Sequence, residues 1–253
     1  MSAYRLAELA GVGIAYLDEG EGDPVLLVHG FASTAMVNWG RTGWLEALSA
    51  AGLRAIAPDN RGHGGSARFY DPAAYAPEAM AADLLRLLDH LSVEQASVAG
   101  YSMGARLGLA LADGHPDRVK ALVLGGVGDV LVRGNPEAEA IAAALEAASL
   151  ADVKERNPRL FRRFAEHTGS DLRALAACMR GQARGVPKEL LGRLRVPIMV
   201  AVGSRDDLAG SPERLAEQME GAEILVVPGA DHMFAPGNPA FKAGVLDFLR
   251  RRS

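Results

Sequence analysis

The sequence has few of the residues on which disulfide-bonded or metal-binding proteins depend. Its 253 residues include one cysteine, Cys178, so an intramolecular disulfide and a thiolate metal cage are both excluded. No His-x-x-x-His or Cys/His spacing is present, and Asp59 with His63 is not a recognisable ligand set. We therefore expect a protein that works without a metal and without a cofactor.

Long apolar runs and a strong net charge are also missing. Residues 1–11 contain Arg5 and Glu8 among their apolar residues, so we expect neither a secretory signal nor a membrane span. A net charge of -4 gives no electrostatic reason for a nucleic-acid partner. The sequence predicts a cytoplasmic protein that acts on a small molecule, and it leaves the oligomeric state open.

Short apolar runs recur along the chain with helical stretches between them. The runs are residues 24–28, 53–57, 96–99, 119–124, 197–202 and 223–227. Strands that alternate with helices indicate an α/β protein with a mostly parallel, doubly wound sheet covered on both faces. Residues 5–9 and 13–17 predict an amino-terminal hairpin, and residues 239–251 predict an amphipathic closing helix.

The alternation stops in the middle of the chain. Residues 126–195 contain no strand-like run, and alanine, arginine and glutamate recur there in helical spacing. Pro136, Pro158 and Pro187 are expected to divide this region into short helices. We therefore predict a core built from residues 1–125 and 196–253, with residues 126–195 inserted as a small helical cap.

The most informative segment is Gly100-Tyr101-Ser102-Met103-Gly104. It lies between the apolar run 96–99 and a helix-like run at residues 105–112. A sharp strand-to-helix turn holds a serine in a strained backbone conformation, and the flanking glycines let neighbouring chain segments pass close to it. The pattern alone is weak, but its setting predicts that Ser102 is a nucleophile.

A serine hydroxyl needs an imidazole to take its proton and a carboxylate to orient that imidazole. Reactive groups in open α/β sheets gather at the carboxyl ends of the strands. His232 follows the run 223–227 and Asp206 follows the run 197–202, so we expect these two to complete a triad. Asp129, after an earlier strand, is the rival acid.

Acyl transfer also generates an oxyanion, which backbone N–H groups must stabilise. Met103, directly after the nucleophile, is one expected donor, and Phe31, in the loop after the first buried strand, is the other. His29 in that loop and His63 after the next strand are expected close to the site without serving as the base. We also consider His29 a candidate for substrate binding.

At this point nearly the whole chain resembles the α/β-hydrolase superfamily. Residues 28–31 resemble its oxyanion loop, residues 59–66 its Asp-x-Arg-Gly-x-Gly-x-Ser segment, residues 100–104 its nucleophile elbow and the helical insertion its cap. The resemblance implies hydrolysis of a carboxylic ester, thioester or lactone through an acyl-enzyme on Ser102. Haloalkane dehalogenases and epoxide hydrolases of this superfamily have an aspartate at that position, which disfavours those activities here.

Residues 100–106 are similar to the elbow of the menaquinone-pathway lyase that eliminates pyruvate, although Ala105 departs from the glycine usual there. This resemblance makes Tyr101 and Arg106 candidate substrate-binding residues, with Arg106 facing an anionic group or held in a structural salt bridge. A lyase or carbon–carbon hydrolase of an acidic ring substrate, and a non-catalytic ligand receptor, stay open as alternatives. Three cap arginines are candidates for further anion contacts or for a solvated helix face: Arg159, Arg162 and Arg163.

Overall fold

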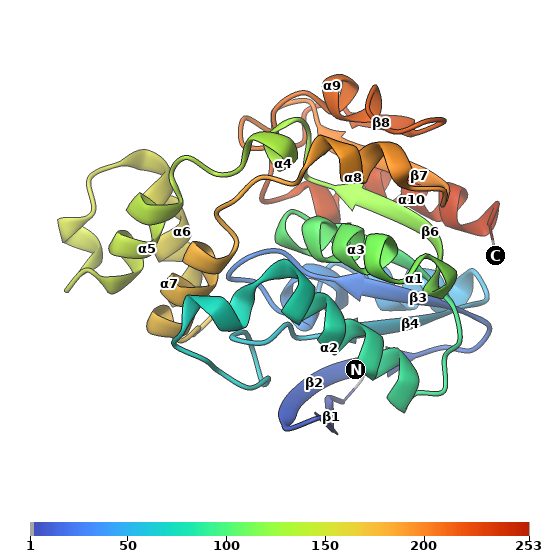
Figure 1. The fold of residues 1–253 in the computed structure, drawn as a ribbon, viewed down its shortest axis with the longest axis horizontal. Helices are drawn as coiled ribbons and strands as arrows, with labels where there is room; N and C mark the ends of the chain where they lie inside the picture. Colours follow the sequence, from blue (N-terminus) through green and yellow to red (C-terminus); the bar gives the residue numbers. More distant parts are fainter. Residues whose placement is uncertain (1–2, 253) are drawn as a thin grey trace.

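The computed structural model describes residues 3–252, and within them eight strands form a single sheet (Figure 1). In spatial order the strands are β1 (Arg5–Leu9), β2 (Val12–Glu19), β4 (Leu53–Pro58), β3 (Asp23–Val28), β5 (Ala96–Tyr101), β6 (Val119–Gly125), β7 (Ile198–Gly203) and β8 (Glu223–Val227). The hairpin of β1 and β2 is antiparallel, β2 pairs antiparallel with β4, and all the other neighbours are parallel. The predicted hairpin and the mostly parallel sheet are both confirmed.

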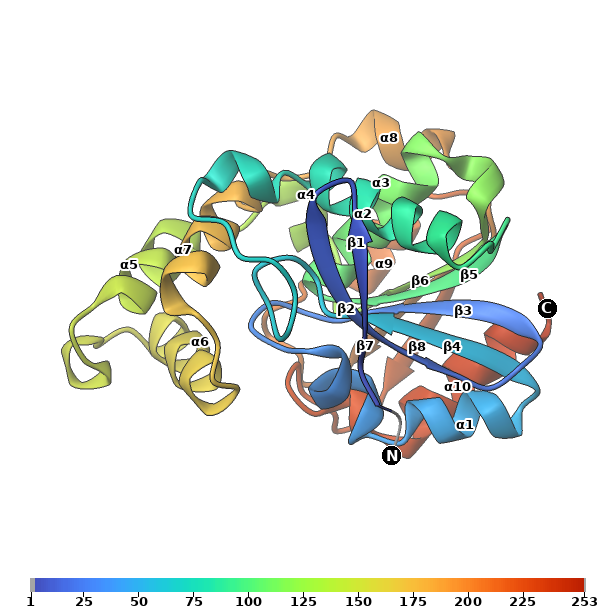
Figure 2. The same ribbon diagram turned by 90° about the horizontal axis from the view of Figure 1, so that it is seen from below.

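Helices cover both faces of the sheet (Figure 2). One face carries α1 (Trp44–Ala50) and α10 (Pro239–Arg250), and the other carries α2 (Pro77–His90) and α3 (Met103–Gly114). The helix α9 (Pro212–Ala216) packs beside β7 and β8. Short helical turns complete this part of the chain: η1 (Met36–Gly40, a π-helix), η2 (Pro72–Tyr75), η3 (Pro116–Arg118) and η5 (Ala235–Gly237).

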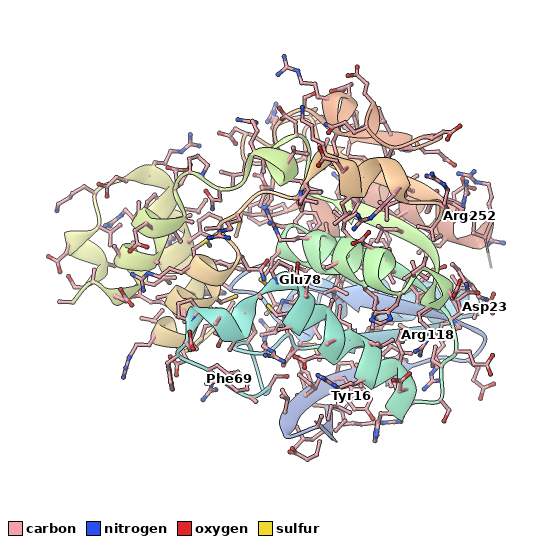
Figure 3. The ribbon with its side chains drawn as sticks, viewed as in Figure 1. Tyr16, Asp23, Phe69, Glu78, Arg118 and Arg252 are labelled. Atoms are coloured by element: carbon pink, nitrogen blue, oxygen red, sulfur yellow. The ribbon has the colours of Figure 1, made fainter. Side chains whose placement is uncertain are left out.

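The strand β3 shows why the central runs are apolar at every position. Val25 and Leu27 pack with α1 and α10, whereas Leu26 and Val28 pack with α2 and α3. All four side chains are at most 1% exposed, because alternate residues of a strand point to opposite faces and both faces are covered. Figure 3 shows Tyr16 where β2 meets α2.

Between β6 and β7 the chain forms helices joined by loops, with no strand. These helices are α4 (Val130–Arg133), α5 (Ala138–Glu146), η4 (Leu150–Asp152), α6 (Arg156–His167), α7 (Leu172–Gly181) and α8 (Lys188–Arg193). Pro136 precedes α5 and Pro187 caps α8, while Pro158 lies inside the first turn of α6, where a missing N–H costs no helical hydrogen bond. Helices α5 to α7 lie together at one end of the sheet, and we propose that they act as a cap (Figure 1).

Arg162 corrects one expectation about the cap. Its side chain is neither a solvated helix face nor free for a substrate anion, because it is 5% exposed and donates to the last carbonyls of α5. The acceptors are the carbonyl oxygens of Ala144, Leu145 and Ala147, at 2.8, 3.0 and 2.9 Å. A fourth partner is the Glu166 carboxylate. Arg162 therefore satisfies carbonyls that a helix end leaves without partners, and it joins α6 to α5.

No helix within residues 3–252 combines the length and the apolar character that crossing a membrane requires.

Candidate active site

The turn between β5 and α3 is the tightest point of the site. Ser102 has φ 54° and ψ −112°, a backbone conformation that residues other than glycine rarely adopt. A Cβ atom at Gly100 would lie 2.2 Å from the Gly104 carbonyl oxygen, and one at Gly104 would lie 2.0 Å from that of Val28. The two glycines thus permit the close chain crossing, and the turn presents the Ser102 hydroxyl at the carboxyl end of β5.

Three side chains from distant loops form a hydrogen-bonded chain. The Ser102 Oγ lies 3.1 Å from His232 Nε2, and His232 Nδ1 lies 2.8 Å from Asp206 Oδ2. Because an ionised carboxylate only accepts hydrogen bonds, the imidazole proton belongs on Nδ1, which leaves Nε2 to accept from the serine hydroxyl. Two backbone N–H groups, those of Leu208 and Ala209, donate to the other Asp206 oxygen at 3.1 and 3.0 Å.

The rival acid is occupied elsewhere. The Oδ1 atom of Asp129 accepts a hydrogen bond from the Ser211 backbone N–H at 2.9 Å, and its carboxylate pairs with Arg133 at 3.3 Å. The Asp206 side chain is fully buried against His232, whereas that of Asp129 is not. The structure therefore brings Asp206, and not Asp129, to the imidazole.

His29 does not reach the cavity, which corrects its expected role in substrate binding. The ring is fully buried, Nδ1–H donates to the Gly30 carbonyl oxygen at 2.8 Å, and Nε2 accepts from the Asn60 N–H at 2.9 Å. Burial lowers the pKa of His29 to about 4, so the ring is neutral near pH 7. Both ring nitrogens are used inside the protein, and no surface of His29 lines the cavity.

The two expected oxyanion donors are free. Within residues 3–252, neither the Phe31 N–H nor the Met103 N–H donates to any protein acceptor. Met103 begins α3, so its N–H lies at a helix amino terminus, where negative charge is stabilised. A Cβ atom at Gly30 would lie 3.5 Å from that of Ser102, which places the loop that carries Phe31 beside the serine.

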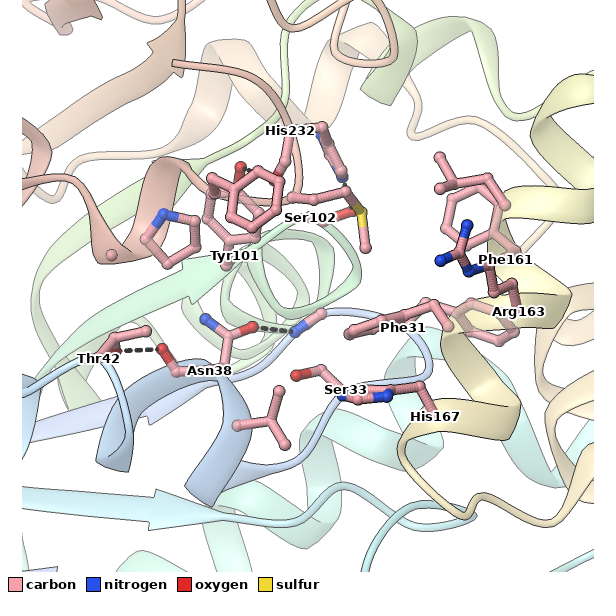
Figure 4. A pocket seen from close by; sticks show the side chains of 18 residues that line it. Phe31, Ser33, Asn38, Thr42, Tyr101, Ser102, Phe161, Arg163, His167 and His232 are labelled. Atoms are coloured by element: carbon pink, nitrogen blue, oxygen red, sulfur yellow. Dashed lines mark hydrogen bonds between the residues drawn. The ribbon is translucent and has the colours of Figure 1, made fainter.

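Two chambers meet at the serine. One has a volume of about 550 Å³ and the other about 310 Å³, and both reach Ser102 and His232. Phe31 and Phe161 line both chambers, and their rings stand edge to face with centroids 5.9 Å apart. Figure 4 shows the larger chamber, with Phe161 and Arg163 of α6 opposite the serine. These two aromatic rings therefore stand at the junction of the chambers.

The chambers differ in chemistry. Side chains specific to the larger one include Asn38, Thr42, Tyr101, Leu160, Phe164 and Phe234. Side chains specific to the smaller one include Arg106, Arg133, Asn135, Glu137, Asn157 and Gln182. Aromatic and aliphatic groups are prominent in the first, and charged and amide groups in the second.

Tyr101 and Arg106 differ in what they contact. The Tyr101 hydroxyl donates to the His232 carbonyl oxygen at 2.6 Å and its ring packs 5.4 Å from the imidazole, so Tyr101 fixes the histidine as well as lining the larger chamber. The Arg106 guanidinium donates to the Arg184 carbonyl, and burial lowers the pKa of Arg106 to about 10. No carboxylate within residues 3–252 forms a salt bridge with Arg106.

Sequence reasoning missed three contributors to the chambers. Asn38 comes from the π-helix η1, and Phe161 with Phe164 comes from α6. Histidine and serine motifs have local signals, but a phenylalanine on a cap helix has the same spacing whether it packs in a core or lines a cavity. The residues around Asn38, including Trp39 and Trp44, likewise form no pattern that predicts a π-helical turn.

Comparisons with known proteins give one consistent result. A family model described as "alpha/beta hydrolase fold" matches residues 23–174. An epoxide hydrolase from Caballeronia sordidicola is 38% identical over 112 residues, which are 44% of this chain and only 33% of that protein. RutD from Caulobacter sp. (strain K31), named for carbamate hydrolysis, is 32% identical over 222 residues, covering 78% of this chain and 81% of RutD. A solved esterase from Thermogutta terrifontis superimposes with a TM-score of 0.82 at 26% identity, covering 100% of both chains.

Proposed function

This chain belongs to the alpha/beta hydrolase family, and from that premise we propose that it is a serine hydrolase of a carboxylic ester, thioester or lactone. The observation that carries the proposal is the chain of contacts from Asp206 through His232 to Ser102, at 2.8 and 3.1 Å. In this proposal no cofactor takes part, and the substrate is a small molecule that enters the chambers above the serine.

In the first half of the proposed reaction, the Ser102 Oγ attacks the carbonyl carbon while His232 Nε2 takes the hydroxyl proton. The negative charge that develops on the carbonyl oxygen is stabilised by the N–H groups of Phe31 and Met103. When the carbonyl reforms, the bond to the leaving alcohol or thiol breaks, and Nε2 returns the proton to it. The product of this half is an acyl ester on Ser102.

In the second half, water attacks the acyl ester. His232 Nε2 takes a proton from the water as its oxygen bonds to the acyl carbon, the bond to the Ser102 Oγ breaks, and the serine regains its proton. The carboxylic acid leaves and the site returns to its starting state. Asp206 keeps the imidazole in one tautomer and stabilises its charged form in both halves.

The serine also bears on the epoxide hydrolase similarity. A carboxylate that opens an epoxide forms an ester, which water cleaves, whereas a serine that opens an epoxide forms an ether, which water does not cleave under these conditions. Ser102 therefore favours acyl chemistry over epoxide opening, although a relative that matches part of this chain is an epoxide hydrolase.

One observation supports a second candidate. Arg106 lines the smaller chamber one helical turn after Ser102, and it forms no salt bridge within residues 3–252, although the Glu78 carboxylate acts on its charge from a longer distance. A substrate carboxylate would supply a directly contacting counter-charge, as in a lyase or carbon–carbon hydrolase of an acidic ring substrate. Conversion of such a substrate without solvent oxygen in the product, and its loss in Arg106→Ala, would favour the lyase.

The proposed function is tested by labelling with a fluorophosphonate probe, because only an activated serine reacts readily. We expect the wild-type protein to be labelled and to hydrolyse activated esters, and Ser102→Ala to lose both properties while it remains folded. Ser97→Ala, which changes a buried serine on the strand that precedes Ser102, is the control and should keep both. Ester hydrolysis that survives in Ser102→Ala would reject the proposal.

A further inference from the structure

Of three consecutive backbone N–H groups in the loop after β3, the outer two are bound by side chains and the middle one is not. The Gly30 N–H donates to Asn38 Oδ1 at 3.2 Å, and the Ala32 N–H donates to His63 Nε2 at 3.1 Å. Between them, the Phe31 N–H has no acceptor within residues 3–252. The N–H groups on either side of the expected oxyanion donor are therefore each bound by a buried side chain.

Ala32 is the point at which the loop is most constrained. It has φ 58°, in the left-handed region that alanine rarely adopts. Its N–H is bound by His63, and its carbonyl oxygen accepts from the Thr168 hydroxyl at 2.9 Å, just after the end of α6. A strained residue persists only where its surroundings hold it, so these two bonds maintain the turn that follows Phe31.

The tautomer of His63 allows its Nε2 atom to accept the hydrogen bond from the Ala32 N–H. Its Nδ1–H donates to the Arg61 carbonyl oxygen at 3.0 Å, so Nε2 carries a lone pair and no proton. The ring is 1% exposed, and burial lowers the pKa of His63 to about 3. Arg61 is in turn fixed by the Asp83 carboxylate at 2.6 and 2.7 Å and lies against the ring of Phe69, which Figure 3 labels.

Asn38 is held from the opposite side of the loop. It lies in the π-helix η1, a rare element that is often found at functional sites. The Thr42 hydroxyl donates to the Asn38 carbonyl oxygen at 2.7 Å, and the Asn38 side chain is oriented by the Gly30 bond that Figure 4 marks. Asn38 is 7% exposed, and its Nδ2 has no partner within residues 3–252. The part of Asn38 that the protein uses is therefore its acceptor oxygen.

We propose that His63 and Asn38 are positioning residues of the oxyanion hole, which bind the N–H groups on either side of Phe31 so that the Phe31 N–H faces the substrate oxygen. This inference rests on the proposed function. Neither side chain touches the reacting atoms. They hold the peptide group that carries the Phe31 N–H in place before the substrate arrives. Such preorganisation is the source of most of an oxyanion hole's effect.

The test compares ground-state binding with transition-state binding. His63→Ala and Asn38→Leu should each lower kcat for an activated ester by about tenfold to a hundredfold, because a displaced donor acts mainly in the transition state. KM should change little in His63→Ala, whereas Asn38 also lines the larger chamber, so its variants are judged by kcat alone. The affinity for a boronic acid, which forms a tetrahedral adduct on the serine, should fall by a similar factor. Asn38→Asp keeps an acceptor oxygen and should recover most of the kcat that Asn38→Leu loses.

The matched control is Ser66→Ala. Ser66 is 4% exposed and lies three residues after His63, but its hydroxyl bonds the Ala15 N–H and the Asp59 carbonyl rather than the oxyanion loop. It should lose thermal stability and keep kcat. Assays are run well below each variant's unfolding temperature, and if His63→Ala does not fold, the Asn38→Leu and Asn38→Asp pair decides the question.

Two results would overturn the inference. One is a folded His63→Ala and Asn38→Leu with wild-type kcat and wild-type boronic acid affinity, and the other is an equal kcat loss in Ser66→Ala, which would make the effect one of stability. A wild-type protein that a fluorophosphonate does not label would instead reject the proposed function, so the two failures are told apart.

Discussion

The floor and the roof of the cavity are built differently. The floor consists of loops that follow strands of the sheet, where His63 is 1% exposed, the side chain of Asp206 is 0% exposed, and both side chains are hydrogen-bonded. The roof is the helix α6, where Leu160 is 37% exposed and Arg163 is exposed. The difference suggests that the floor carries the reaction, which needs fixed geometry, and that the roof carries the choice of substrate, which does not.

The variant Asp206→Asn gives the strongest test of whether the floor carries the reaction. An asparagine of the same shape should leave the fold intact but disturb the imidazole tautomer, so we expect kcat to fall by about 10⁴. Asp129→Asn is the matched control, because its carboxylate bonds Ser211 and Arg133 and not His232. Steady-state kinetics with an activated ester decide between them, and a larger loss in Asp129→Asn would reverse the assignment.

Acid should destabilise the floor selectively. Burial lowers the pKa of His29 to about 4 and of His63 to about 3, below the value near 6.5 of an unfolded histidine. The two neutral rings therefore contribute fully to the free energy of unfolding above pH 6.5. This contribution is lost as the pH falls toward 4 and 3, because the unfolded chain binds protons that the folded chain excludes. At pH 5 the two rings together should lower the free energy of unfolding by about 4 kcal/mol.

The groups that face these rings are few. The two imidazoles stand edge to face with centroids 5.1 Å apart, and the Asp59 carboxylate acts on His63 as an opposite charge that raises its pKa. Urea unfolding at a series of pH values measures the effect, with His29→Asn as the variant that should flatten the curve. A stability that does not change between pH 7 and 5 would contradict the account.

The roof should depend on Arg162 for its stability. Arg162→Ala removes hydrogen bonds from three carbonyls at the end of α5, and we expect the free energy of unfolding to fall by about 3 kcal/mol. Arg163→Ala, the exposed neighbour, should change it by less than about 0.5 kcal/mol. Thermal unfolding and limited proteolysis of the cap check both values, and equal effects would show that Arg162 has no special role.

The smallest expected effect concerns the substrate preference that we assign to the roof. Phe161→Ala should join the two chambers and raise the relative kcat/KM for a bulky ester over an acetate ester by about tenfold. Phe164→Ala, which lines only the larger chamber, is the matched control and should change this ratio less. A ratio that is unchanged in Phe161→Ala would mean that the roof does not set substrate size.

The same division separates what the sequence predicts from what it does not. Ser102, Asp206 and His232 lie in the segments that follow β5, β7 and β8, so the parallel sheet brings them to one edge, and the structure places them in hydrogen-bonding order. The same reasoning predicts His29 at this edge, but it cannot tell a side chain that points into the cavity from one that points beneath the loop. His29 bonds Gly30 and Asn60 instead of lining the cavity, so its expected role in substrate binding is wrong.

Individual roles within the helical insertion and the π-helix have no local sequence pattern. The sequence predicts helices after β6, but Arg162 and Arg163 are neighbours of the same type, and only packing makes one a buried partner of the α5 carbonyls and the other part of a chamber wall. Asn38 is recognisable only once the turn of η1 has brought its side chain to the Gly30 N–H. A contact between residues that belong to no recognisable motif can be identified only from the three-dimensional structure.

The central claim is that Ser102 carries the acyl group during turnover. The most direct measurement is mass spectrometry of the protein after rapid acid quenching of its reaction with p-nitrophenyl acetate, followed by peptide mapping. The account predicts an acetyl group on the peptide that contains Ser102, formed at least as fast as turnover. Turnover without that adduct, or with the acetyl group on another residue, would contradict it.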